Sequence, residues 1–165
     1  MPQEMIHQEA IKLAVESEKE LMCFYQKAAE MVVDPDSKKI FDRLSGEKKN
    51  HVGYFFRYYR GTEFGTYEEF IDAPCPAEAQ VMKELGGIIN GQVKERRARE
   101  IAMDKEQRFA KTLQAKAAKI VDPGVRTVFD QMARESEKHY EIIESEYARF
   151  MRMPHETDID TYVRE

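Results

Sequence analysis

Residues 14–51 and residues 102–139 are two copies of one segment, separated by a constant offset of 88 positions and no gap. They read AVESEKELMCFYQKAAEMVVDPDSKKIFDRLSGEKKNH and AMDKEQRFAKTLQAKAAKIVDPGVRTVFDQMARESEKH. Eleven of the thirty-eight aligned pairs are identical, which is more than chance gives in an ungapped comparison. The repeat predicts a fold built from two related halves that contribute the same elements.

Each copy carries an Asp-Pro pair between two stretches whose apolar residues recur at three- and four-residue steps, the spacing of amphipathic helices. Asp suits the N-cap of a helix and Pro its first position, so Asp34-Pro35 and Asp122-Pro123 each mark the start of a new helix. We expect helices over about 3–33, 35–60, 92–121 and 123–151. The short turns make each pair an antiparallel hairpin.

The segment 61–91 between the hairpins is rich in glycine, and we expect it to be a crossover with a short helix near 77–85. A helix of about 25 residues is roughly 38 Å long, a length that some thirty residues can travel. Such a crossover makes the second and third long helices parallel. The sequence thus predicts an all-α four-helix bundle of hairpins 3–60 and 92–152, in one domain spanning 1–165, with an acidic tail at 153–165.

Composition narrows the classes of function. The net charge of −5 argues against a nucleic-acid partner, and no apolar run approaches the length of a membrane span. The polar start is unlike a signal peptide, so we expect a cytoplasmic protein. Cys23 and Cys75 form no Cys-x-x-Cys motif, which excludes an iron–tetracysteine module; we expect Cys23 to be buried and Cys75 to lie in a loop.

Four carboxylates and two imidazoles occupy matched positions of the repeat: Glu18, Glu47, His51, Glu106, Glu135 and His139. Glu18 and Glu106 fall within the apolar stripes of their helices, and Glu47 and His51 are one turn apart on the next helix. Carboxylates that converge in a core repel one another unless cations or protons compensate them. Carboxylates with two imidazoles suit iron, manganese or zinc, so the set predicts a metal site.

A single buried Glu or His is more often a hydrogen-bonded core residue than a ligand. The duplicated pairing favours metal, because a structural hydrogen bond has little reason to recur with the same composition. Glu16 is a weaker candidate for supporting a ligand, and Tyr25 either hydrogen-bonds a ligating carboxylate or packs in the core. His7 and His155 have no counterpart in the other half, and we expect both to be exposed.

The stretch VESEKELMCFYQKAAE (15–30) resembles the first helix of the rubrerythrin family in the ferritin-like superfamily, and FDQMARESEKHYEIIESEY (129–147) resembles its last helix. The resemblance covers all four helices. It implies a carboxylate-bridged di-iron centre in a ferritin-like bundle that is commonly dimeric and acts on peroxide or dioxygen. Carried across, Glu18 and Glu106 are ligands from the first and third helices, and His51 and His139 from the second and fourth.

The chain departs from the family at two positions. The family has a bridging Glu three residues before each His, whereas this sequence has Lys48 and Ser136 there. Glu47 and Glu135 lie four residues before the histidines. Either the bridging pair is lost, or a small helix rotation or a local bulge brings these two in. An inward-pointing Lys48 would put an ammonium near the site and disfavour metal.

The resemblance and the six candidate ligands together predict a metal-binding protein, with two irons most favoured and zinc or manganese as alternatives. The expected activity is reduction of peroxide or dioxygen, or oxidation of Fe²⁺, with an external electron donor and a homodimeric assembly. One variant has a single metal held by Glu18, His51, Glu106 and His139. The competing hypothesis is a non-enzymatic bundle that binds a metal such as zinc or serves as an interaction protein.

Overall fold

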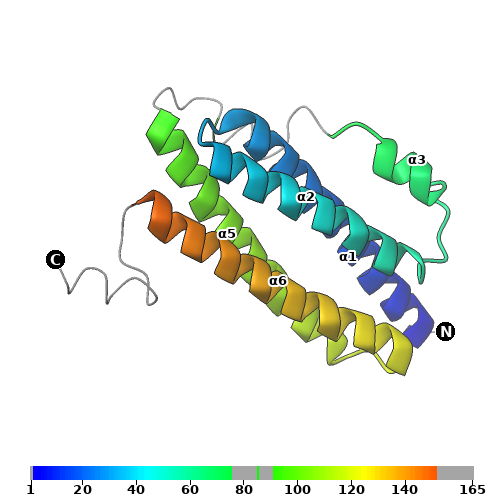
Figure 1. The fold of residues 1–165 in the computed structure, drawn as a ribbon. Coiled ribbons are helices and arrows are strands. Elements are labelled where there is room, and N and C mark those ends of the chain that lie inside the picture. The colour runs from blue at the N-terminus through cyan, green and yellow to red at the C-terminus, as the bar shows by residue number, and fades with distance from the viewer. Residues whose placement is uncertain (1, 76–84, 86–90, 152–165) are drawn as a thin grey trace.

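The computed structural model describes residues 2–75, 85 and 91–151. Within them lie four long helices: α1 (Pro2–Met31), α2 (Pro35–Phe56), α5 (Gly91–Ala117) and α6 (Pro123–Phe150). The α1–α2 hairpin lies alongside the α5–α6 hairpin (Figure 1). No β-strand occurs in this part of the chain, and the predicted all-α four-helix bundle is confirmed.

The two Asp-Pro pairs start α2 and α6 as predicted. Asp34 has an extended backbone, and its carboxylate accepts a hydrogen bond from the backbone N of Ser37. Asp122 repeats this arrangement and accepts from the backbone N of Gly124 and Val125. Both carboxylates therefore satisfy backbone donors that the first turn of a helix leaves without a partner.

Contacts between helix ends give the direction of each helix. His7, near the start of α1, accepts a hydrogen bond from the backbone N of Val121, just after α5, at 3.3 Å. Glu95, near the start of α5, accepts one from the backbone N of Asp34, just after α1, at 2.8 Å. Helices α1 and α5 are therefore antiparallel, which makes α2 and α5 parallel (Figure 1). This is the long-crossover connection of ferritin-like bundles.

The helices end a few residues earlier than predicted, α2 at Phe56 rather than near residue 60. Beyond it lies a short helix, α3 (Tyr67–Asp72), which the sequence analysis did not predict. Its N-cap is Thr66, whose hydroxyl accepts from the backbone N of Glu69 at 3.1 Å. The short helix expected at 77–85, Leu85 apart, and the tail at 153–165 lie outside the described residues.

Two contacts hold the α3 segment against α1. The ammonium of Lys19 donates to the backbone carbonyls of Phe70 and, at 2.9 Å, of Ala73 near the end of α3. A disulfide joins Cys23 of α1 to Cys75, 52 positions later. The sequence analysis expected Cys23 to be buried and Cys75 to lie outside the helices, which is what is found, but it did not pair them. Among the described residues, no helix is both long and apolar enough to cross a bilayer.

Candidate metal centre

Two glutamates lie at the middle of the bundle with no exposed surface, Glu18 of α1 and Glu106 of α5. Ala14 and Ala102, one turn earlier on the same helices, are also buried. Residues four positions apart share a helix face, so the apolar stripe that forms the core also carries these carboxylates inward. An ionised carboxylate in such a place is costly unless a positive charge or hydrogen-bond donors compensate it.

Lys48 of α2 supplies that compensation. Its side chain is fully buried, and Nζ lies 3.4 Å from Oε2 of Glu18 and 3.1 Å from Oε2 of Glu106. The ammonium also donates to Oγ of Ser136 at 3.4 Å and lies 5.1 Å from the centre of the Phe109 ring. Lys48 therefore has the inward orientation that the sequence analysis named as unfavourable to metal.

The charged groups of this cluster shift one another's pKa values. Burial alone would lower the pKa of Lys48, but the charges of Glu106 and Glu18 outweigh it and raise that pKa. Burial alone would raise the pKa of Glu106, but Lys48, His139 and a hydrogen bond from Tyr25 hold it at about 2. Lys48 is consequently an ammonium and Glu106 a carboxylate at neutral pH.

The two histidines of the repeat lie next to each other. The rings of His51 and His139 are stacked with their centres 5.4 Å apart and their planes 3° from parallel. Nδ1 of His51 is 3.4 Å from Oε2 of Glu18, and Nδ1 of His139 is 3.4 Å from Oε1 of Glu106. Each half of the repeat thus supplies one imidazole whose Nδ1 faces the buried glutamate of its neighbouring helix.

The protonation of the two rings follows from these neighbours. Neither Nδ1 has a hydrogen bond of good geometry among the described residues, and both are buried. A nitrogen lone pair facing a carboxylate oxygen at 3.4 Å would be repelled, whereas an N–H would be attracted. We therefore assign a proton to Nδ1 of His51. In His139 the same argument requires an N–H on Nε2, because its 2.7 Å contact with Oε2 of Glu47 is the shorter of the ring's two carboxylate contacts.

Glu47 and Glu135 lie at the outer side of the cluster. Their side chains are 34% and 31% exposed, unlike the fully buried Glu18 and Glu106. Oε2 of Glu47 is 2.7 Å from Nε2 of His139, the ring nitrogen that faces away from Glu106. Glu135 forms a group with His51 and His139 in which one ligand atom from each lies within 4.8 Å of the others.

Tyr25 of α1 adds a further hydrogen bond to the buried cluster. Its hydroxyl donates to Oε1 of Glu106 at 2.6 Å, across the interface between the hairpins. Burial and the neighbouring carboxylate of Glu106 raise the pKa of Tyr25 well above its usual value, so it stays a donor. Its ring also stacks on Phe41, 6.0 Å away. Both alternatives considered for this residue, hydrogen bonding and core packing, therefore hold.

The other candidates from the sequence lie elsewhere. Glu16 is exposed, and His7 is engaged with the turn after α5. His155 lies outside the described residues.

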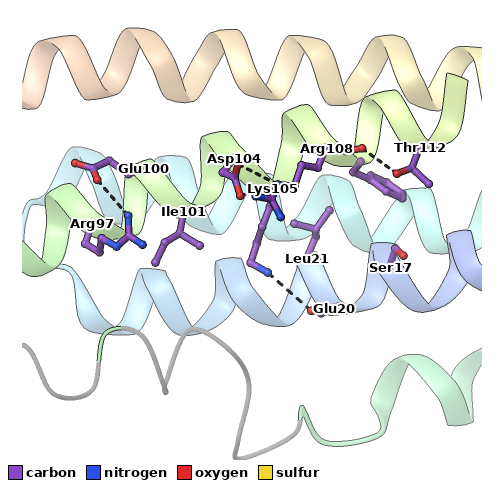
Figure 2. Close-up of a pocket in the computed structure, with 11 residues that line it drawn as sticks. Ser17, Glu20, Leu21, Arg97, Glu100, Ile101, Asp104, Lys105, Arg108 and Thr112 are labelled. Carbon is purple, nitrogen blue, oxygen red and sulfur yellow. Dashed lines mark hydrogen bonds and ion pairs between the residues drawn. The ribbon is translucent and has the colours of Figure 1, made fainter. Parts of the chain in front are cut away.

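A groove of about 650 Å³ lies between α1 and α5 (Figure 2). Its charged residues form ion pairs with one another: Arg97 with Glu100, Arg108 with Asp104 and Lys105 with Glu20. Phe109 lines the groove and also contacts the ammonium of Lys48, so its ring lies between the groove and the buried cluster.

The sequence model of the rubrerythrin family matches residues 9–147, most of the chain. The chain belongs to the rubrerythrin family. No curated protein and no solved structure gives a significant match. Family membership agrees with the ferritin-like connection of the bundle and with the two buried Glu–His pairs.

The residues present do not fit the bridged di-iron centre that the family implies. At the two positions where the family has bridging glutamates stand Lys48, which pairs with both remaining carboxylates, and Ser136. The ammonium of Lys48 lies between the two buried carboxylates, so an ion placed there would meet a positive charge in a dry core. A single ion fits the outer side of the cluster, where His51, His139 and Glu135 converge.

Proposed function

We propose that this rubrerythrin-family protein binds one divalent transition-metal ion through His51, His139 and Glu135, at the outer side of the imidazole pair. The observation that carries the proposal is the convergence of one ligand atom from each of these residues within 4.8 Å. Two imidazoles and one carboxylate with open positions are a donor set used for both zinc and non-haem iron. Glu47 has a carboxylate oxygen within reach as a fourth ligand, 2.7 Å from Nε2 of His139.

The buried carboxylates support this assignment from the other side of the rings. A metal-bound histidine usually donates its second ring N–H to a carboxylate, which fixes the tautomer and the ring orientation. Glu18 and Glu106 lie on that side of the rings, each with an oxygen 3.4 Å from Nδ1 of its neighbouring histidine. With the proton on Nδ1, His51 keeps the lone pair of Nε2 for an ion. At His139 an ion would replace the proton that Nε2 shares with Glu47.

The reaction chemistry depends on which ion binds. An iron ion would supply one-electron chemistry toward peroxide or dioxygen, with electrons from an external donor, whereas zinc would supply only binding and charge. Zinc should bind more tightly than Fe²⁺ or Mn²⁺, because affinities for nitrogen and oxygen donors rise along that series. The proposal therefore favours a one-metal protein over the two-iron peroxidase expected from the family.

Equilibrium dialysis against Zn²⁺, Mn²⁺ and, without oxygen, Fe²⁺ tests the proposal by metal analysis. We expect one ion per chain in the natural protein, and none at these residues in a His51→Ala/His139→Ala variant. Glu135→Gln should weaken binding, while Glu141→Gln, an exposed residue of the same helix, should not. His7→Ala serves as the histidine control, because His7 is remote from the pair and engaged with Val121.

Two results would contradict the proposal. Equal metal content in the natural protein and the double histidine variant would remove the ion from these residues. Two irons per chain, with rapid loss of added peroxide in a quenched-flow assay, would restore the two-iron function.

A single-domain chain of 1–165, a cytoplasmic location and a homodimer also remain proposals. An exposed apolar strip near the start of α1 supports the dimer: Met5 is 62%, Ile6 49% and Leu13 42% exposed. Such a strip is a candidate contact between copies of the chain. Light scattering over a range of concentrations tests it, and a monomer at every concentration would be the contrary result.

A further inference from the structure

The ammonium of Lys48 has three partners inside the bundle. It donates hydrogen bonds to Glu106 at 3.1 Å and to Ser136 at 3.4 Å, and it forms an ion pair with Glu18 at 3.4 Å. These residues come from α1, α5 and α6, while Lys48 comes from α2. One cation thus joins all four long helices at their centre, as a metal ion bound by residues of every helix would.

The two departures from the family pattern, Lys48 and Ser136, are structurally coupled. Lys48 and Ser136 occupy equivalent positions of the repeat, and their side chains are in contact. A glutamate at 136 would add a third buried negative charge, and a second lysine would add another positive one. Serine instead supplies a small neutral acceptor that leaves room for the ammonium.

We propose that Lys48 is a built-in counter-ion that occupies the buried carboxylate pair in place of a metal ion and limits this protein to one bound metal. The limit to one metal rests on the proposed function, whereas the counter-ion role holds for the metal-free chain. Lys48 acts here as a specificity-determining residue: it decides how many ions enter and leaves the outer His51–His139–Glu135 group as the metal site.

The first experiment measures the thermal melting temperature of chelator-treated, metal-free protein. Lys48→Met keeps the length of the side chain but removes its charge, which leaves Glu18 and Glu106 facing each other unpaired. We expect the melting temperature to fall by about 10 °C. The matched control is Lys49→Met, which removes an exposed lysine from the same helix and should change little.

A second variant covers the case in which Lys48→Met does not fold. Lys48→Met/Glu106→Gln removes one charge of each sign and keeps the net charge of the natural cluster. We expect it to fold and to melt at a higher temperature than Lys48→Met. A double variant that is unfolded, or no more stable than Lys48→Met, would overturn the counter-ion role.

The second experiment counts bound metal with Zn²⁺ and with Fe²⁺ under anaerobic conditions. Lys48→Glu/Ser136→Glu restores the carboxylate positions of the family, and we expect about two ions per chain, against one in the natural protein. Addition of metal should raise the melting temperature of this variant by more than it raises that of the natural protein. An unchanged count of one ion in this variant would overturn the limit.

The two proposals fail in different ways. If the natural protein binds no metal but Lys48→Met still melts at a lower temperature than the natural protein, the proposed outer metal site is wrong and the counter-ion role stands. If the natural protein binds one ion but Lys48→Met has the same melting temperature as the natural protein, Lys48 is not the counter-ion and the outer site stands.

Discussion

Nζ of Lys48 lies 3.1 Å from Oε2 of Glu106, and neither side chain exposes any surface to solvent. A buried pair of this kind adds little to stability compared with apolar residues of the same size. Removal of one partner is costly, because it leaves the other charge buried and unpaired. The bundle is therefore sensitive to single changes at its centre and tolerant of similar changes on its surface.

Glu106→Gln should lower the free energy of unfolding by about 3–5 kcal/mol, because it removes a charged partner of Lys48. Urea denaturation of metal-free protein measures this effect. Glu20→Gln, whose side chain is 67% exposed, is the control and should change stability by less than about 0.5 kcal/mol. Equal losses in the two variants would show that the buried carboxylate has no special role.

Tyr25→Phe should cost roughly 1.5–3 kcal/mol, the usual range for a hydrogen bond to a charged group, because Glu106 loses its 2.6 Å donor. The ring that packs on Phe41 is retained, so the loss reports the hydroxyl alone. Tyr54→Phe, at a position that is 45% exposed, is the matched control. Urea midpoints that coincide for both variants would contradict the prediction.

The charge of Asp34, the N-cap of α2, should make the stability of the protein depend on pH. Hydrogen bonds from Ser37 and Arg149 lower the pKa of Asp34 against the opposing effect of burial. A lowered folded-state pKa adds stability above the unfolded-state value near 3.9, and this stability is lost as the pH falls through the folded-state pKa.

Asp34→Asn should therefore be less stable than the natural protein at pH 7, by up to about 1 kcal/mol, with the difference vanishing at low pH. Asn is itself a good N-cap, so the substitution isolates the charge. Asp122→Asn is the matched substitution at the N-cap of α6, where the carboxylate accepts from the backbone N of Gly124 and Val125, and it should lower the stability at pH 7 by less. Chemical denaturation at a series of pH values makes the comparison, and an Asp34→Asn deficit that grows toward low pH would be the wrong sign.

Reduction of the Cys23–Cys75 disulfide should destabilise the protein by ~4 kcal/mol in the chain-entropy account of a loop closed across 52 positions. Cys75→Ser should match the reduced natural protein, and a reductant should not change it further. A melting temperature that does not change on reduction would contradict the prediction. Thiol trapping in cells tests the location separately: disulfides are rare in the cytosol, so a disulfide trapped in cells would argue against the cytoplasmic proposal.

The repeat by itself determines the architecture. Its ungapped offset and the Asp-Pro pairs predict two matched hairpins, because helix periodicity and N-caps depend on local sequence. The same periodicity brings Glu18, Glu106, His51 and His139 to inward faces, where the structure finds them. The apolar stripes, rather than the polar residues, fix these positions.

Tertiary structure alone decided what these residues face. Adjacent residues of a helix differ by about 100° in direction, so the pattern could not decide whether Lys48 or Glu47 points inward. The structure buries Lys48 and leaves Glu47 at the edge, 34% exposed. The outcome depends on contacts from the other hairpin, with Glu106 and Ser136 accepting from the ammonium and His139 facing Glu47.

The disulfide and α3 were equally beyond sequence reasoning. Cys23 and Cys75 are 52 positions apart, and only the return of the chain along α1 brings them together. Lys19 looks like one more charged residue of an amphipathic helix, yet its ammonium holds the backbone carbonyls at the end of α3. Local sequence specifies which residues form helices and which face is apolar. The partner of each polar group is set by a segment distant in the chain, because buried charges and backbone groups are satisfied wherever the fold brings a complement within reach.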